Sequence, residues 1–248
     1  MKQKRRGMSE PASFCQRMQL KVHSFSNLAQ NVHFDDVLFQ LAQKHGAGEY
    51  LRFWESPVYG IVLGRIGKEE DDIHIDVAAK DNIPIIRRSS GGGTVVQGPG
   101  CLNYALVLSK KKRPILDDLR ASYQWISEKI IAALKERDID AVFCPISDLA
   151  RASDHKKFSG NAQRRAKDFV LHHGTILYGF DLDLIPKYLK IPKDMPQYRN
   201  ARSHKDFVTN IYINVPEFQL SLAAAFEAEI DPQPLTAQEI SFLEKYNI

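Results

Sequence analysis

The sequence of 248 residues contains only three cysteines, Cys15, Cys101 and Cys144. An odd number without C-x-x-C spacing argues against a disulfide framework or a zinc site, and it is typical of a reducing compartment. No apolar run reaches the ~20 residues that a membrane-spanning helix requires, and no apolar segment follows the basic start of the chain. The alternation of aromatic and basic residues found in RNA-reading modules is also lacking. These absences predict a non-secreted, cytoplasmic protein that binds neither a membrane nor nucleic acid.

The net charge is mildly positive, at +4, and the lysines and arginines concentrate in residues 2–6, 110–113 and 156–167. Clusters of this kind usually keep a surface soluble, and they would also suit an acidic carrier protein. The length fits one large domain with an ample core. We therefore expect a flexible basic tail over residues 1–17 and a single domain over residues 18–248, with no large accessory domain after it.

Short β-rich runs alternate with amphipathic stretches along the chain. The predicted strands lie at residues 18–22, 50–55, 58–64, 84–88, 94–96, 103–108, 141–144, 157–163 and 169–178. The predicted helices lie at residues 28–44, 115–137, 181–189, 204–211, 216–229 and 236–246. The runs at 50–55 and 58–64 are separated by Ser56-Pro57 and are expected to pair as antiparallel neighbours. Strands clustered around few helices predict an α+β domain with a largely antiparallel sheet and flanking helices.

A glycine-rich segment carries the strongest local signal. It reads Arg87-Arg88-Ser89-Ser90-Gly91-Gly92-Gly93-Thr94-Val95-Val96. Three glycines permit positive φ and close approach, so peptide N–H groups can turn toward an anion, and Arg88 adds a permanently charged fork. No Gly-Lys-Ser/Thr follows as in a P-loop, and Thr94-Val95-Val96 favours a strand. The segment predicts a site for an activated carboxylate or a phosphate, although alone it also fits a hairpin with two solvated arginines.

Further segments give this loop a context. They are Ser147-Asp148-Leu149, then Lys157-Phe158-Ser159-Gly160-Asn161-Ala162, then His172-His173-Gly174-Thr175-Ile176-Leu177. With the glycine loop, in this order, they resemble the biotin/lipoate protein ligase family, and in particular its lipoate-protein ligase A branch. Asn27-Leu28-Ala29 and Val62-Leu63-Gly64-Arg65 are similar to early segments of that family. The resemblance covers roughly residues 20–190 and implies the fold shared by biotin and lipoate ligases and by class II aminoacyl-tRNA synthetases.

The resemblance also implies an activity: a catalytic domain that joins lipoate or octanoate to a lysine of an acceptor through an acyl-adenylate. The cofactors would be ATP with Mg²⁺, with no metal site made by protein groups alone. The acceptors would be lipoyl domains of 2-oxoacid dehydrogenase complexes or the glycine cleavage H protein. Lys157 matches the essential lysine, whose charge would stabilise the carbonyl oxygen and the α-phosphate. The expected substrate-binding residues are Arg88, Ser90, Gly91, Gly92, Gly93, Thr94, Val95, Val96, Asn103, Asp148, Gly160, His173 and Gly174.

Several of these residues have a second interpretation. Asp148 either reaches a ribose hydroxyl or a magnesium ion or caps a turn, and Asn103 either binds substrate or completes the turn after the loop. Gly174 either allows a close backbone approach or marks a β-bulge. His172 and His173 are adjacent on a strand, so they face opposite sides and cannot chelate one metal ion together, and one of them is expected to face the pocket. Gln163-Arg164-Arg165 is expected to be a solvated strand end.

Three departures from the family pattern bear on the activity. Gln97 stands where family members commonly have histidine, and an amide binds substrate but shuttles no proton near pH 7. Ser147 precedes Asp148, where bacterial lipoate ligases usually have asparagine. Only residues 191–248 follow the matched region, too few for the accessory domain of bacterial two-domain ligases. Adenylation is therefore expected to be impaired or to need a separate accessory protein.

Two other functions stay open. Cys144, just upstream of Asp148, resembles the nucleophile of the octanoyl- and amido-transferase branch, which takes an acyl group from a thioester without ATP. Lys157 or Arg88 would then favour its thiolate, whereas the plainer alternative is a buried cysteine that ends a strand. A non-catalytic relative that holds lipoate or an adenylate is the other possibility. A biotin ligase fits less well, because its loop normally reads Gly-Arg-Gly-Arg.

Overall fold

The computed structural model describes residues 17–46 and 48–246, so the expected basic tail, including Cys15, lies outside the described residues except for residue 17. A seven-stranded sheet runs through the centre in the order β1-β2-β6-β10-β9-β8-β7. Its strands are β1 (Gln19–Val22), β2 (Tyr50–Trp54), β6 (Cys101–Ser109), β7 (Ala141–Cys144), β8 (Asp148–Arg151), β9 (Lys157–Arg165) and β10 (Phe169–Leu177). Among these, β1 and β2 pair in parallel and all other neighbours are antiparallel.

A second, three-stranded sheet has the order β4-β3-β5. It consists of β3 (Gly60–Leu63), β4 (Ile85–Arg87) and β5 (Val95–Gln97). The glycine loop connects β4 to β5, which lie on opposite sides of β3 rather than beside each other. The loop is therefore a crossing connection at one end of the small sheet and not the tip of a hairpin.

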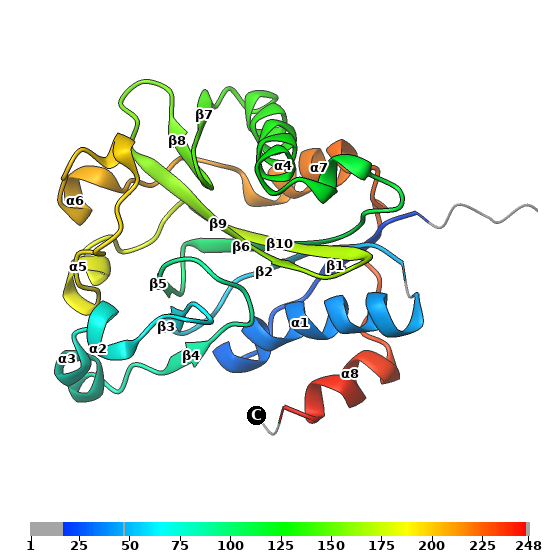
Figure 1. The fold of residues 1–248 in the computed structure, drawn as a ribbon, viewed down its shortest axis with the longest axis horizontal. Coiled ribbons are helices and arrows are strands. Elements are labelled where there is room, and N and C mark those ends of the chain that lie inside the picture. Colours follow the sequence, from blue (N-terminus) through cyan, green and yellow to red (C-terminus); the bar gives the residue numbers. More distant parts are fainter. Residues whose placement is uncertain (1–16, 47, 247–248) are drawn as a thin grey trace, which may run out of the picture.

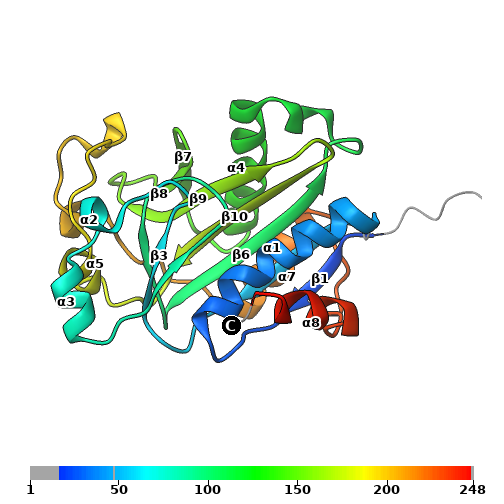
Figure 2. The same cartoon turned by 60° about the horizontal axis from the view of Figure 1, so that its bottom comes forward.

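Helices cover both faces of the large sheet, as Figures 1 and 2 show. On one face lie α1 (Leu28–His45) and α8 (Ala237–Glu244), and on the other lie α4 (Leu119–Lys135) and α7 (Val215–Ala225). Three short helices lie near the small sheet: α2 (Glu69–Asp72), α3 (Ile75–Lys80) and α5 (Leu184–Tyr188). A fourth, α6 (His204–Phe207), packs against α5. Two 3-10 turns complete the chain, η1 (Pro114–Asp117) and η2 (Gln197–Arg199). The α+β class with a largely antiparallel sheet is confirmed.

Local chemistry explains where the long helices begin and end. Asn27 caps α1 by accepting a hydrogen bond from Ala29 N at 2.7 Å, and Gly46 ends it in the left-handed conformation, as glycine readily does. In α4, Ile126, Ile130 and Leu134 fall at spacings of four and are fully buried against the large sheet. Burying each such side chain contributes about 1.5–3 kcal/mol, so this apolar stripe fixes α4 on the sheet. No helix of the described residues is long and apolar enough to cross a membrane.

The expected antiparallel pairing of residues 50–55 with 58–64 is wrong. β2 lies in the large sheet between β1 and β6, whereas β3 lies in the small sheet. The turn between them is closed by Ser56, whose hydroxyl donates to Val58 O at 2.6 Å. This turn carries the chain from one sheet to the other, which a local pattern of β-rich runs does not reveal.

Smaller differences concern the ends of elements. The predicted helix at 115–137 begins at Leu119, where Asp118 caps it, and η1 precedes it. Ser203 caps α6, which ends at Phe207 rather than at residue 211. Helices α2 and α3 were not predicted, because each is too short to show an apolar stripe. Asp148 lies at the start of a short strand, β8, that is not among the predicted strands.

Candidate active site

A cavity of about 680 Å³ is lined by both sheets, and its size is typical of ligand pockets. Most of the predicted residues meet there: Arg88, Gly92, Gly93, Thr94, Val95, Val96, Asn103, Asp148, Lys157, Gly160, His173 and Gly174. Ser90, Gly91 and Cys144 lie outside its lining. Residues that are far apart in the sequence thus line one cavity, with the glycine loop on one side and β9 and β10 on the other.

Arg88 holds the glycine loop in place. Its Nη2 donates to Gly91 O at 2.7 Å and to Gly93 O at 2.8 Å, and its Nε donates to Ser90 Oγ at 3.0 Å. Its side chain is almost fully buried, and this burial lowers its pKa to about 10, so it stays charged at neutral pH. Most of its N–H donors form hydrogen bonds within the protein. Arg88 therefore acts on the cavity mainly by fixing the shape of the glycine loop.

Two glycines make this shape possible. Gly92 has φ +85°, a conformation that strains other residues. A Cβ on Gly64, in the strand end that precedes Arg65, would lie 2.1 Å from Gly92 O. The loop can therefore pack against β3 only because both positions lack a side chain, and Gly91 and Gly93 have open space where a Cβ would stand.

Lys157 lies at the start of β9 with its ammonium on the cavity wall. Its Nζ is 2.7 Å from Asp148 Oδ1, and Tyr198 donates its hydroxyl to Asp148 Oδ2 at 2.8 Å. A Cβ on Gly160 would lie 3.0 Å from both Cε and Nζ of Lys157, so the missing side chain leaves room for the lysine. Asp148 thus anchors Lys157 and is itself held by Tyr198, a residue that the sequence analysis did not single out.

His173 faces the cavity and His172 faces the opposite side of the sheet, which confirms the expected alternation. His173 Nε2 is 2.6 Å from Ser90 Oγ, and its Nδ1 is 3.5 Å from Asp35 Oδ2. Asp35 in turn pairs with the fully buried Arg52 at 2.6 Å. His172 is buried beside Tyr104, and burial together with the charge of His173 lowers its pKa to about 3, so it is neutral at physiological pH.

Gly174 and Asn103 have structural roles in the floor of the cavity. A Cβ on Gly174 would lie 1.9 Å from Asn161 Oδ1 and 2.5 Å from the hydroxyl of Tyr104. Gly174 pairs in register with both neighbouring strands, so the bulge interpretation is wrong. Asn103 accepts a hydrogen bond from Gln97 Nε2 at 2.7 Å and donates to Cys101 O at 3.1 Å.

Cys144 lies at the end of β7, buried and unpaired with another cysteine among the described residues. Burial and the Asp148 carboxylate raise the pKa of its thiol, while Arg202 acts weakly in the opposite direction. The expectation that Lys157 or Arg88 favours its thiolate is wrong, because the charges that shift the pKa of this thiol are Asp148, which raises it, and Arg202.

Several cavity residues were not identified from the sequence. They include Asp35, Trp54, Tyr104, Asn161 and a group from residues 185–208 that closes one side of the cavity. Asp35 had a visible signal, because it falls at helical spacing on the apolar face that contains Val32 and Phe39. The described residues contain no group of three or more His, Cys, Asp or Glu side chains that could hold a metal ion.

The chain belongs to the lipoyl protein ligase A/B catalytic domain family, whose profile matches residues 27–227. Relatives that the chain matches are named as lipoate-protein ligases and as octanoyltransferases. A probable lipoate-protein ligase A of Mycoplasma pneumoniae is 29% identical over 186 residues, which cover 75% of this chain and 53% of that protein. The octanoyltransferase LipM of Oceanobacillus iheyensis is 25% identical over 237 residues, which cover 85% of this chain and 86% of that protein. The chain spans about half the length of the first ligase relatives that it matches.

Solved structures share the fold. A bipartite lipoate protein ligase of Thermoplasma acidophilum has 22% sequence identity and a TM-score of 0.80, with 92% of this chain and 91% of that chain covered. A lipoate-protein ligase A bound with ATP has 21% identity and a TM-score of 0.79, with 93% and 94% covered. The resemblance drawn from the motifs is confirmed at the level of family and fold.

Proposed function

We propose that this chain is a lipoate-protein ligase. It activates lipoate or octanoate with MgATP to an acyl-adenylate, and it transfers the acyl group to a lysine of an acceptor lipoyl domain. The observation that carries the proposal is one cavity in which an anchored ammonium, a glycine loop with open space over its backbone and an apolar wall meet.

The apolar part of the cavity suits a medium-length acyl chain. Val32, Trp54 and Val62 come from α1, β2 and β3 and pack together as one buried cluster, and Val95 packs against it. Their burial excludes water from the acyl chain, and apolar contact here contributes about 25 cal/mol per Å² that leaves water. The carboxylate end then points toward the glycine loop and Lys157.

In the first step, a carboxylate oxygen of the acid attacks the α-phosphorus of ATP, and the bond to pyrophosphate breaks. Lys157 turns from Asp148 toward the α-phosphate, where its charge offsets the growing negative charge. Asp148 Oδ1 is then available to the magnesium ion of MgATP, which prefers a carboxylate combined with substrate phosphates.

In the second step, the neutral amine of the acceptor lysine attacks the acyl carbon, and a bond from nitrogen to carbon forms. The carbonyl oxygen carries the negative charge of the tetrahedral intermediate, and Lys157 stabilises it. The bond from carbon to the AMP oxygen breaks, and AMP leaves while the amine loses its proton to solvent.

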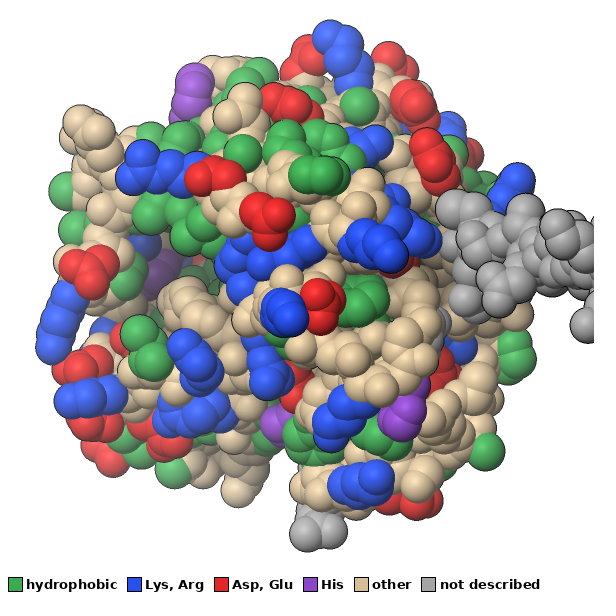
Figure 3. All heavy atoms as spheres, turned by 45° about the vertical axis from the view of Figure 1, so that its right-hand side comes forward, with side chains coloured by type: hydrophobic (Ala, Val, Ile, Leu, Met, Phe, Trp, Pro, Cys, Tyr) green, Lys and Arg blue, Asp and Glu red, His purple; other side chains and the backbone are tan. Residues whose placement is uncertain are grey.

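The partners follow from the same chemistry. The acceptor is a lipoyl domain of a 2-oxoacid dehydrogenase complex or the glycine cleavage H protein, and a solved relative is described as a bipartite ligase with an E2 lipoyl domain. A separate accessory chain is a further candidate partner, because one relative is named as subunit 1 of a lipoate-protein ligase A of Thermoplasma acidophilum. Figure 3 shows Lys and Arg side chains gathered near the middle of one face, which would suit an acidic partner.

An ATP-independent octanoyltransferase is the second candidate. The match to an octanoyltransferase over 86% of its length favours it. Its expected nucleophile is Cys144, whose thiol has a raised pKa and which lies outside the cavity lining. Both observations argue against the transferase, because the thiolate is the nucleophile.

One experiment separates the two. The purified chain is incubated with an acceptor lipoyl domain and either free lipoate with MgATP or octanoyl carrier protein without ATP, and acylation is followed by mass spectrometry. If the protein is a ligase, we expect acylation of the lipoyl domain only with free lipoate and MgATP, and we expect Cys144→Ser to retain this activity. Attachment from the carrier alone, abolished by Cys144→Ser, would establish the transferase instead. If neither donor works, even with a candidate accessory chain present, the protein is a binder without chemistry.

A further inference from the structure

Residues 231–246 form a segment that we call the strap. It lies beyond the family match, which ends at residue 227. It is fixed to the edge of the large sheet through Lys21 of β1. Lys21 Nζ donates to Pro234 O at 2.8 Å and pairs with Glu239 at 3.0 Å, and both charged side chains are almost fully buried. Glu239 also forms the capping box of α8 with Thr236. Removing one partner of a buried ion pair is strongly destabilising, so the strap is firmly attached at this end.

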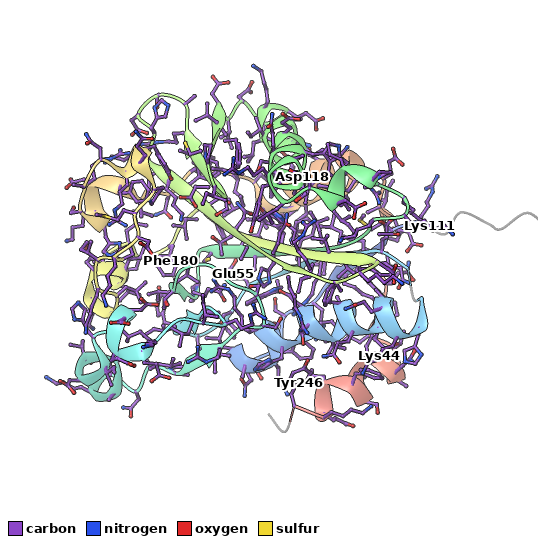
Figure 4. All side chains as sticks on the ribbon, in the orientation of Figure 1. Lys44, Glu55, Lys111, Asp118, Phe180 and Tyr246 are labelled. Carbon is purple, nitrogen blue, oxygen red and sulfur yellow. The ribbon has the colours of Figure 1, made fainter. Side chains whose placement is uncertain are left out.

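The far end of the strap contacts α1, where Figure 4 places Tyr246. The Tyr246 hydroxyl donates to Asp36 Oδ2 at 2.5 Å and accepts from Gln40 Nε2 at 2.6 Å. Its ring stacks on His33 with centroids 4.8 Å apart. Burial raises the pKa of Asp36, but the hydrogen bond from Tyr246 and the charge of Arg164 outweigh this and hold the pKa below its ordinary value. Asp36 is therefore a carboxylate at neutral pH.

The same carboxylate reaches the glycine loop. Asp36 Oδ1 accepts a hydrogen bond from Ser89 Oγ at 2.9 Å and contacts Arg164 Nη1 of β9. Arg164 was expected to be a solvated strand end, and this contact shows that it is paired. Ser89 directly precedes Ser90, which contacts His173 and Arg88 inside the site. One buried carboxylate thus joins the strap, the loop that faces the ligand and the strand that carries Lys157.

We propose that Tyr246 is a positioning residue for the glycine loop and acts through Asp36 and Ser89. This inference rests on the proposed function, because it assigns the loop to binding the activated acyl group. Tyr246 touches no cavity atom, so its effect is to limit the positions of the loop and not to contact substrate. Loss of its hydroxyl leaves Asp36 free to turn toward Arg164 and loosens Ser89, and the loop then binds its ligand less well.

The test compares Tyr246→Phe with Phe242→Leu. Tyr246→Phe removes only the hydroxyl and keeps the stacking on His33. Phe242→Leu weakens the packing of α8, in the same strap, without touching Asp36. Hydrogen–deuterium exchange of residues 88–93 and KM for lipoate in acyl transfer are measured in both. Tyr246→Phe is expected to speed exchange in the loop and to raise KM about fivefold or more with little change in kcat, a size typical of coupling between sites. Phe242→Leu is expected to change exchange only in α8.

Ser89→Ala provides the second arm. It is expected to reproduce the effect of Tyr246→Phe, and the double variant is expected to be no worse than either single variant, because both act through one path. Unchanged loop exchange in Tyr246→Phe, or equal effects from Phe242→Leu, would overturn the inference. A parent protein that transfers no acyl group while Tyr246→Phe still loosens the loop would instead refute the proposed function and leave the positioning role standing.

Discussion

Replacement of Gly160 by alanine is expected to separate activity from stability. The added Cβ would lie 3.0 Å from both Cε and Nζ of Lys157, where ordinary contacts are 3.4–4 Å, so the lysine must shift by a few tenths of an ångström. Misplacement of a catalytic group by about 1 Å can cost about 100-fold in rate, so a shift of about half that size predicts a loss of about tenfold in kcat. Gly160 does not have a positive φ, so alanine restricts the unfolded chain and stabilises the fold by about 0.4–1 kcal/mol.

Single-turnover acyl transfer and thermal unfolding measure the two effects. Gly179→Ala is the matched control, because its Cβ would meet only Gly100 Cα at 3.9 Å and it lies outside the cavity lining. The control should match the parent in acyl transfer and should be stabilised about as much as Gly160→Ala, because Gly179 also lacks a positive φ. A kcat for Gly160→Ala within twofold of the parent would refute the claim that the position of the Lys157 ammonium limits the rate. A lower melting temperature would show that Gly160 is needed for the stability of the fold instead.

Two further predictions concern buried charges near the site. Asp35→Asn leaves Arg52 buried without its carboxylate and should lower the free energy of unfolding by about 3–5 kcal/mol in urea titrations, and a loss below about 1 kcal/mol would contradict the buried pair. The pKa of His172 is about 3 in the folded protein and ordinarily 6.5. Its contribution to the free energy of unfolding is therefore complete above pH 6.5 and is lost as the pH falls toward 3. Each pH unit below 6.5 should cost up to about 1.4 kcal/mol, and His172→Gln should flatten this dependence; equal slopes in both proteins would show that His172 is not the group responsible.

The sequence predicted those features that depend on local spacing. The four-residue spacing of Ile126, Ile130 and Leu134 sufficed to place α4, and the alternation of a strand sufficed to place His172 and His173 on opposite sides. The ordered motifs were enough to bring Arg88 and Lys157 to one cavity. The first two features follow from local spacing alone, whereas the meeting of Arg88 and Lys157 followed from the resemblance to the family.

Features that depend on distant contacts could not be read in the same way. Tyr198 reaches Asp148 from 50 positions along the chain, and the proline-punctuated segment that carries it has no periodic pattern. The hydrogen bonds from Arg88 to the carbonyls of its own loop depend on how the loop turns. The sequence therefore predicted that Arg88 binds an anion and did not reveal that it fixes the conformation of the loop. The separation of β2 from β3 into two sheets depends on the turn at Ser56, which resembles an ordinary hairpin turn in sequence.

Lipoate-dependent release of pyrophosphate from MgATP measures directly whether this protein forms an acyl-adenylate with the help of Lys157. It is measured in the parent, in Lys157→Met and in Lys156→Met, the adjacent lysine that lies outside the cavity lining. We expect release in the parent, a loss of about 100-fold or more in Lys157→Met because a charge that stabilises the transition state is removed, and parental activity in Lys156→Met, with all three proteins folded at the assay temperature. Release by Lys157→Met within a few-fold of the parent would contradict this expectation.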